Sequence, residues 1–271
     1  DERPSVVINC AAYGAYSSQT DAERIYRINF HAVRHLLDAA RELPQLRAFI
    51  QAGSSSEYGL NCSAPPEDGP TLPDSDYAVS KIAATAAVQF YALKHGVPAW
   101  ALRLYSVYGP FEDFSRLMPR LLLAARENSF PPLVNPAISR DFIFVEDVCR
   151  AVAAIVQRAT AGRGGDVREA GALRPGEVYN IGTGVRTSLA ELVALVRSVF
   201  GVASEPAWGS MPNRAWDHQE WYADPRKAER DFGWKASVSV RDGLIAMRRW
   251  LDENPELVRE GQKSTVLSVK P

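Results

Sequence analysis

The chain has 271 residues, of which 46% are hydrophobic and 23% charged, so it can bury a substantial core as one large domain or a domain with a lobe. Its formal net charge of -1 argues against a general nucleic-acid binder, and it implies that an anionic ligand is held by a few placed arginines. The sequence contains no apolar run of membrane-spanning length and no N-terminal signal-peptide pattern, so we expect the cytoplasm as its compartment.

The cysteines and histidines predict neither a disulfide framework nor a metal site. The three cysteines are widely spaced; Cys10 in an apolar run and Cys149 on a helix are expected to be buried, and Cys62 to lie in a loop. The histidines form no ligand cluster: they are His31, His35, His95 and His218.

Strand-like and helix-like patterns alternate along the chain, which predicts a parallel α/β sheet. Strands are expected at residues 5–11, 47–52, 97–105, 141–145 and 177–181, and helices at 21–41, 77–95, 115–128, 146–159, 188–200, 224–232 and 240–254. The glycine-rich segment 160–176 is expected to be a mobile loop, and the polar tail after Pro255 is expected to fray.

Tyr77 and Lys81 lie four residues apart within an expected helix, so their side chains project from the same face. A phenol is a poor base at neutral pH because its pKa is about 10, and a nearby ammonium lowers that pKa. The pair alone would more simply be a surface tyrosine beside a solvated lysine. The serine-rich end of the preceding strand, residues 54–56, favours a catalytic interpretation, in which a carbinol exchanges its proton while a hydride moves.

Further motifs lie in order along the chain, at residues 6–12, 26–30, 102–110, 140–148, 179–184 and 224–234. Together with the Tyr77 and Lys81 pair, they resemble the extended short-chain dehydrogenase/reductase family, in its nucleotide-sugar epimerase/dehydratase branch. The resemblance runs from Ser5 to about Asn254. It implies a Rossmann-like doubly wound parallel sheet with a smaller C-terminal α/β substrate lobe.

The resemblance also implies domain boundaries. Residues 1–110 would form a partial cofactor and catalytic domain, to which segments at about 141–160 and 177–200 return. Residues 111–140 and 201–271 would form mainly the substrate-binding lobe.

By the same resemblance, Ser54, Tyr77 and Lys81 are the catalytic set. Ser54 is chosen because it lies four residues before Tyr58 of the Tyr-Gly pair, and its neighbours Ser55 and Ser56 remain alternatives. The implied cofactor contacts, to NAD or NADP, are Ala11, Ala12, Asn29, Tyr77 and Lys81. The implied substrate contacts are Ser55, Ser106, Arg140, Arg214 and Asp217.

The diphosphate contacts also have a chemical basis. A nucleotide diphosphate is best held by bidentate cationic donors, and arginine suits that geometry better than lysine. The resemblance places Arg140 and Arg214 on the diphosphate and Asp217 on the nucleoside ribose. A solvated loop pair is the alternative for Arg214 and Asp217.

The chain departs from the family where the cofactor pyrophosphate would bind. It has no glycine-rich strand-to-helix turn before its first expected strand, so about two strand-helix units of ~30 residues are absent. We expect the sequence to be part of a longer protein; a truncation that binds cofactor poorly is the alternative. The segment 182–187 mimics the fingerprint, but Thr187 replaces its third glycine, and the family carries this motif in its substrate lobe.

Other departures narrow the expected reaction. Ser55 and Ser56 stand where family dehydratases carry an Asp-Glu pair, which disfavours dehydration, although the neighbouring Glu57 could act as an acid. The expected function is therefore an NAD(P)-dependent nucleotide-sugar epimerase or 4-keto-sugar reductase that moves a hydride at a hexose carbon, C4. The alternatives are a non-catalytic nucleotide-sugar-binding module and a 4,6-dehydratase. The expected partners are a nucleotide-diphosphate sugar and a second copy of the chain.

Overall fold

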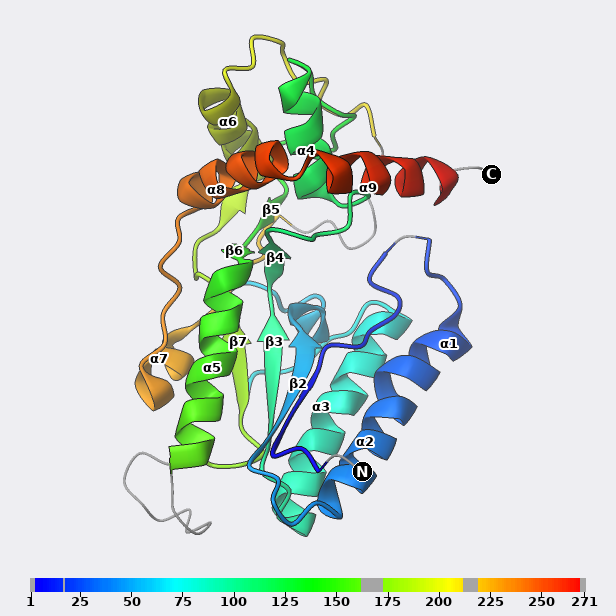
Figure 1. The fold of residues 1–271 in the computed structure, drawn as a ribbon, viewed down its shortest axis with the longest axis vertical. Coiled ribbons are helices and arrows are strands. Elements are labelled where there is room, and N and C mark those ends of the chain that lie inside the picture. The colour runs from blue at the N-terminus through cyan, green and yellow to red at the C-terminus, as the bar shows by residue number, and fades with distance from the viewer. Residues whose placement is uncertain (1–2, 17, 162–172, 212–218, 269–271) are drawn as a thin grey trace.

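The structure, a computed structural model, describes residues 3–16, 18–161, 173–211 and 219–268. A four-stranded parallel sheet lies at the centre of the lower half in Figure 1, in the order β1-β2-β3-β7. Its strands are β1 (Val6–Asn9), β2 (Ala48–Ser54), β3 (Ala99–Leu104) and β7 (Val178–Ile181). The predicted α/β fold with a parallel sheet is thereby confirmed.

Alternate residues of the strands face two different layers of helices. Phe49, Ala99 and Ala101 pack against α2 (Ala32–Arg41) and α3 (Asp76–His95). Ile50, Trp100 and Leu102 pack instead against α5 (Val145–Ala161) and α7 (Arg226–Phe232). Figure 1 shows α2 and α3 on one side of the sheet and α5 on the other, which is the doubly wound arrangement. Both sheet faces are therefore buried over β2, β3 and β7, as their continuous apolar runs require, whereas Ile8 of the edge strand β1 is 49% exposed.

The helix predicted over residues 21–41 is interrupted in its middle. It consists of α1 (Ala22–Tyr26), a π-helical turn (Arg27–His31) and α2. Asn29, within that turn, is 1% exposed; its amide donates to the carbonyl of Tyr13 at 2.7 Å and to the Ser80 hydroxyl at 3.0 Å. The widened turn thus directs a polar side chain inward, where its hydrogen bonds are all made within the protein.

A second apolar core lies above the sheet in Figure 1. It contains buried side chains of α4 (Leu117–Arg126), α6 (Leu189–Phe200) and α8 (Val240–Glu253), together with β6 (Phe142–Phe144). The other strands of this region are β4 (Ser106–Tyr108), which pairs with β6, and the antiparallel pair β5 (Ser139–Arg140) and β8 (Thr187–Ser188). The sequence predicted that segment 177–200 returns to the sheet domain. Within this segment β7 pairs with β3 of the sheet, whereas the buried side chains of α6 belong to the second core.

The expectation of a frayed tail is wrong, because the chain continues as α9 (Pro255–Ser268). Proline suits the first turn of a helix, where its missing N–H has no partner to lose, and Val258 is buried against the second core. The segment expected to be a mobile loop, residues 160–176, lies mostly outside the described residues.

The expected burial of two cysteines is also wrong. Cys10 is exposed because it follows the last residue of an edge strand, and Cys149 is exposed because the buried stripe of α5 runs through Asp147, Ala151 and Ile155. Cys62 is the buried cysteine, and its thiol donates to the carbonyl of Glu220 at 2.8 Å. Within the described ranges, no helix is long and apolar enough to cross a membrane, and no group of His, Cys, Asp and Glu could hold a metal ion.

Candidate active site

The side chains of Tyr77 and Lys81 emerge from the first turns of α3, beside the carboxyl end of β2. The helix begins at Ser75, whose hydroxyl accepts a hydrogen bond from the N–H of Ala78 at 3.3 Å. Lys81 is 2% exposed; its Nζ atom donates to the carbonyl oxygen of Ala52 at 3.0 Å and lies 5.7 Å from the centroid of the Tyr77 ring. The predicted shared face of the pair is therefore directed into the protein rather than into solvent.

Ser54 ends β2 and caps the single 3-10 turn Ser55–Tyr58 that follows it. Its hydroxyl accepts from the N–H of Ser56 at 3.1 Å, while its own N–H donates to the Glu57 carboxylate at 3.1 Å. Ser54 also lies close enough to the Tyr77 phenol to affect its pKa. The structure thus brings together Ser54, Tyr77 and Lys81, the three residues that the sequence predicts as catalytic.

The pKa of Tyr77 is raised, which differs from the expectation that Lys81 lowers it. Burial is the largest cause of this rise; Ser54 acts in the opposite direction, and the Glu57 carboxylate raises the pKa further. The pKa of Lys81 is itself lowered, chiefly because burial disfavours the ammonium, although the Glu57 charge opposes that effect. Because its pKa is raised, the Tyr77 phenol keeps its proton at neutral pH and can act as a proton donor.

Glu57 and Arg103 form a buried ion pair directly beneath this arrangement, and the sequence analysis missed it. Their side chains are 0% and 7% exposed, and Arg103 Nε lies 2.9 Å from Glu57 Oε2. Arg103 also donates to the Tyr58 hydroxyl at 2.8 Å and to the carbonyl of Glu67 at 2.9 Å. One signal in the sequence could have revealed the pair: an arginine inside an apolar strand needs an anionic partner.

The loop after β1 carries the predicted cofactor contacts. Ala11 and Ala12 are exposed, and a Cβ atom added at Gly14 in the same loop would meet the Tyr77 ring at 3.2 Å. The loop therefore lies beside the Tyr77 phenol. Asn29 is placed differently, because its side chain holds the backbone of Tyr13 and the hydroxyl of Ser80 and is buried beneath that loop.

These residues fit the nicotinamide-ribose end of a dinucleotide. Small side chains leave space beside β1, and the Tyr77 phenol and Lys81 ammonium supply the hydrogen-bonding groups. Segment 182–187, which mimics the dinucleotide fingerprint, has its glycine turn filled by a side chain of the protein. The carboxylate of Asp141 accepts from the N–H groups of Thr183 and Gly184 at 2.8 and 2.9 Å, so that turn binds a side chain instead of a phosphate.

Two of the predicted substrate contacts, Ser55 and Arg140, meet at Trp221. The Ser55 hydroxyl accepts from the indole N–H of Trp221 at 3.1 Å, and the guanidinium of Arg140 lies over the Trp221 ring at 4.9 Å from its centroid. Ser106 lies close to the same region, because its N–H donates to the carbonyl of Asp141, the residue after Arg140, at 2.9 Å. Trp221 is therefore a functional candidate that sequence reasoning missed. Arg214 and Asp217 lie outside the described residues.

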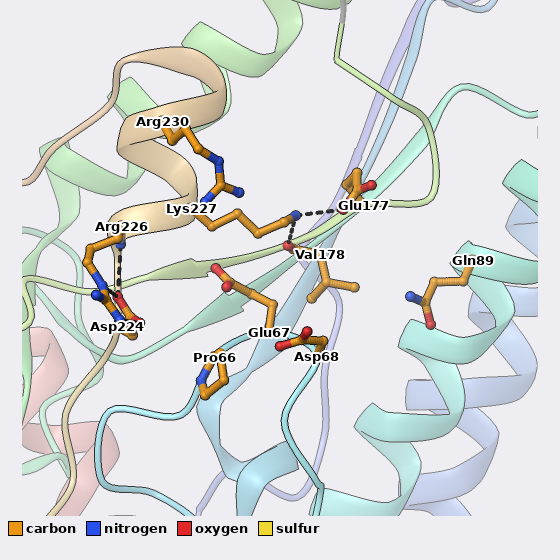
Figure 2. Close-up of a pocket in the computed structure, with 10 residues that line it drawn as sticks. All are labelled: Pro66, Glu67, Asp68, Gln89, Glu177, Val178, Asp224, Arg226, Lys227 and Arg230. Carbon is orange, nitrogen blue, oxygen red and sulfur yellow. Dashed lines mark hydrogen bonds and ion pairs between the residues drawn. The ribbon is translucent and has the colours of Figure 1, made fainter.

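A cavity of about 600 Å³ opens at the outer edge of β7, away from the predicted site residues, none of which lines it. Figure 2 shows Lys227 reaching across it to Glu177 and to the carbonyl oxygen of Val178, at 2.7 and 2.8 Å, while Arg226 pairs with Asp224. Lys227 and Arg226 are thus paired with acidic residues of the same wall. The Glu67 carboxylate accepts from the N–H of Asn180 at 2.9 Å, so side chains cover this edge of the sheet.

Comparison with known proteins gives consistent matches. Residues 1–182 match the NAD dependent epimerase/dehydratase family. The chain is 29% identical to a dTDP-glucose 4,6-dehydratase of Streptomyces griseus over 238 residues, which cover 86% of the chain and 67% of that protein. It is 29% identical to UDP-glucuronate 4-epimerase 2 of Arabidopsis thaliana over 224 residues, which cover 80% of the chain and 51% of that protein.

The fold is similar to that of a UDP-glucuronic acid 4-epimerase from Bacillus cereus, solved with UDP-glucuronic acid and NAD. The TM-score is 0.78 at 25% identity, and the match covers 92% of the chain and 76% of that structure. The three curated relatives that match first are spanned over 67%, 33% and 33% of their length.

Proposed function

Because the chain belongs to the NAD dependent epimerase/dehydratase family, we propose that it is an NAD-dependent enzyme that acts on a nucleotide-diphosphate sugar. Relatives named for UDP- and dTDP-sugars support this substrate class. The single observation that carries the proposal is the convergence of Ser54, Tyr77 and Lys81 at the end of β2.

The proposed chemistry is oxidation or reduction of a carbinol, at C4 of the hexose. Bound NAD would supply the hydride acceptor or donor. Tyr77 exchanges the proton of the substrate oxygen, and Ser54 holds that oxygen by a hydrogen bond. Lys81, whose ammonium is held against the carbonyl of Ala52, would bind the nicotinamide ribose. The oxygen loses its proton as the carbon loses its hydride, so the alcohol becomes a ketone, and reversal of both transfers restores an alcohol.

Epimerisation or ketone reduction is favoured over 4,6-dehydration. Dehydration needs an acid and a base beyond the tyrosine, and the residues after Ser54 do not supply them freely. The Ser55 hydroxyl is bonded to Trp221, and the Glu57 carboxylate is 0% exposed and paired with Arg103. These contacts support an enzyme that leaves C6 of the sugar unchanged.

The substrate is held, in this proposal, by residues of the second lobe. Arg140 lies over Trp221, whose indole N–H bonds to Ser55 beside Ser54, and its guanidinium would bind the diphosphate. Arg214 and Asp217 would contribute a second diphosphate contact and a ribose contact.

Product analysis tests the proposal. The purified protein is incubated with NAD or NADH and with UDP- and dTDP-hexoses or their 4-keto derivatives, and the products are identified by NMR. A C4 epimer with constant nicotinamide absorbance indicates an epimerase, and stoichiometric loss of NADH indicates a reductase. A 4-keto-6-deoxy product would overturn the preference against dehydration. Nucleotide-sugar binding without turnover, in protein that also binds NAD, would instead indicate a non-catalytic module.

A further inference from the structure

The buried carboxylate of Glu57 is a group that the proposed chemistry does not use, although it lies beneath all three catalytic side chains. Its Oε1 atom accepts from the N–H of Ser54 at 3.1 Å, and its Oε2 atom lies 2.9 Å from Arg103 Nε. A Cβ atom added at Gly53 would come within 2.7 Å of Oε1, so the glycine leaves room for the carboxylate. Glu57 therefore occupies a site shaped for it at the end of β2.

The 3-10 turn that carries this carboxylate also packs against α3. Thr85, which lies one turn beyond Lys81 and two turns beyond Tyr77 on the same face, is one of the groups that favour the charged form of Glu57. Burial raises the pKa of Glu57, but Arg103, Ser54 and Thr85 all favour its charged form. The guanidinium 2.9 Å from Oε2 and the hydrogen bond on Oε1 stabilise the charged form and so oppose the effect of burial.

The charge of Glu57 acts on the catalytic pair from the interior. The groups that face the Tyr77 phenol are Ser54 from β2, Glu57 from the 3-10 turn, Arg116 from the start of α4, Tyr16 from the loop after β1, and Lys81 from its own helix. Those that face Lys81 are Glu57 and Cys10. Within these two described sets, Glu57 is the one carboxylate and is common to both. Arg116, which has the opposite effect on the phenol, is 41% exposed and therefore screened by solvent.

We propose that Glu57, held by Arg103 beneath the end of β2, is a positioning residue for the proton transfer at Tyr77. Its hydrogen bond fixes the backbone of Ser54, and its negative charge keeps the phenol protonated and the Lys81 ammonium charged. Glu57 does not touch the substrate, because it is fully buried. The catalytic role of Tyr77 in this inference rests on the proposed function, whereas the effect of Glu57 on the phenol can be measured without turnover.

The test is a spectrophotometric titration of tyrosinate in four proteins: wild type, Tyr77→Phe, Glu57→Gln, and the double variant. The difference between the first two proteins isolates the Tyr77 phenol, and the difference between the last two isolates it without the charge of Glu57. Glutamine keeps an acceptor for Ser54 and removes the negative charge. We expect the isolated titration to move to lower pH by about one unit. The acid limb of the kcat profile should move in the same direction, with KM for the nucleotide sugar nearly unchanged.

Glu67→Gln is the matched control. Glu67 belongs to the same hydrogen-bonded network, since Arg103 donates to its carbonyl oxygen and its carboxylate accepts from Asn180, but it does not face Tyr77. We expect this control to lower stability without moving the Tyr77 titration. An unchanged titration in folded Glu57→Gln protein, or an equal shift in Glu67→Gln protein, would overturn the inference.

A second variant covers the case in which Glu57→Gln does not fold because Arg103 is left unpaired. Glu57→Gln combined with Arg103→Met replaces the ion pair by neutral side chains of similar size, a change that buried pairs often tolerate. The same downward shift is expected. If neither variant folds, the inference is also contradicted, because the role of Glu57 would then be structural. Absence of turnover in wild type with an intact titration shift would reject the proposed function alone.

Discussion

The Nζ atom of Lys81 lies 3.0 Å from the carbonyl oxygen of Ala52, so a hydrogen bond joins α3 to β2 two residues before Ser54. This contact fixes the distance between the helix that carries Tyr77 and the strand that ends in Ser54. It also satisfies a buried ammonium, which would otherwise be costly so far from solvent. The lysine thus has a structural contact as well as its proposed role.

Replacing the phenol tests the proposed acid/base group directly. We expect Tyr77→Phe to lower kcat by about 10²–10⁴-fold, because the substrate oxygen loses its proton-exchange partner, with little change in nucleotide-sugar affinity. Steady-state kinetics and isothermal titration calorimetry measure the two effects. Tyr26→Phe is the matched control, since its hydroxyl bonds to Asp76 at the start of the same helix, at 2.9 Å. Retained turnover in Tyr77→Phe would remove the phenol from the mechanism.

A substitution of Arg140 tests the proposed contact between its guanidinium and the diphosphate of the substrate. Arg140→Lys keeps the charge but loses the planar group that lies over Trp221, so we expect KM for the nucleotide sugar to rise by about tenfold with kcat nearly unchanged. Arg186→Lys, in an exposed pair with Glu220, is the control and should leave KM unchanged. Equal KM values for the wild type and Arg140→Lys would count against the assignment.

The pKa of Glu112 leads to a prediction of how the stability of the fold depends on pH. Burial raises the pKa of this carboxyl from 4.5 to about 7, although its ion pair with Arg116 acts against the shift. A carboxyl whose pKa is raised in the folded state stabilises the fold below pH 4.5 and loses that contribution as the pH rises through about 7. Relative to Glu112→Gln, the wild type should therefore lose about 1–3 kcal/mol of unfolding free energy across this range.

Urea unfolding at a series of pH values measures the difference between the two proteins. Glu127→Gln, at the exposed end of α4, should follow the wild type throughout. A constant difference between wild type and Glu112→Gln would show that the carboxyl does not titrate in this window.

Gly59 ends the 3-10 turn that follows β2, and a substitution there tests the conformation of this turn. Its φ is +53°, and an added Cβ atom would lie 1.8 Å from the carbonyl oxygen of Leu72. We expect Gly59→Ala to cost about 3 kcal/mol or more, because both the backbone conformation and the contact are unfavourable. Gly96→Ala provides the control, since its φ is +68° and no atom lies within 4 Å of the added carbon. That change should cost only about 1–2 kcal/mol, and similar thermal midpoints for the two variants would contradict the steric argument.

The expected homodimer can be tested on α3. Val79, Phe90 and Leu93 are 40%, 51% and 75% exposed, and their spacing places them along one side of the helix. We expect Phe90→Glu and Leu93→Glu to convert a dimer into a monomer in sedimentation experiments. Leu60→Glu, which changes a leucine that is 67% exposed outside this helix, should leave the dimer intact. A wild type that sediments as a monomer would exclude this pairing.

Local patterns predicted most of the elements. The spacing of apolar residues located the strands and helices within a few residues, because burial on one face imposes a period of two or 3.6. The four-residue interval from Tyr77 to Lys81 likewise predicted a shared helix face. Such patterns did not reveal the π-helical turn at Asn29, since its cause lies in partners at Tyr13 and Ser80, which are distant in sequence.

The composition, the order of strands and helices, and the Tyr77 and Lys81 pair were determined by the sequence alone, because periodicity and spacing are properties of neighbouring residues. The tertiary structure decided which buried polar groups meet. Glu57 and Arg103 are 46 residues apart, and Ser55 and Trp221 are 166 apart, and each pair meets through strand register and the placement of loops. The pKa of Tyr77 depends on these meetings, since burial and the charge of Glu57 outweigh the groups that lower it.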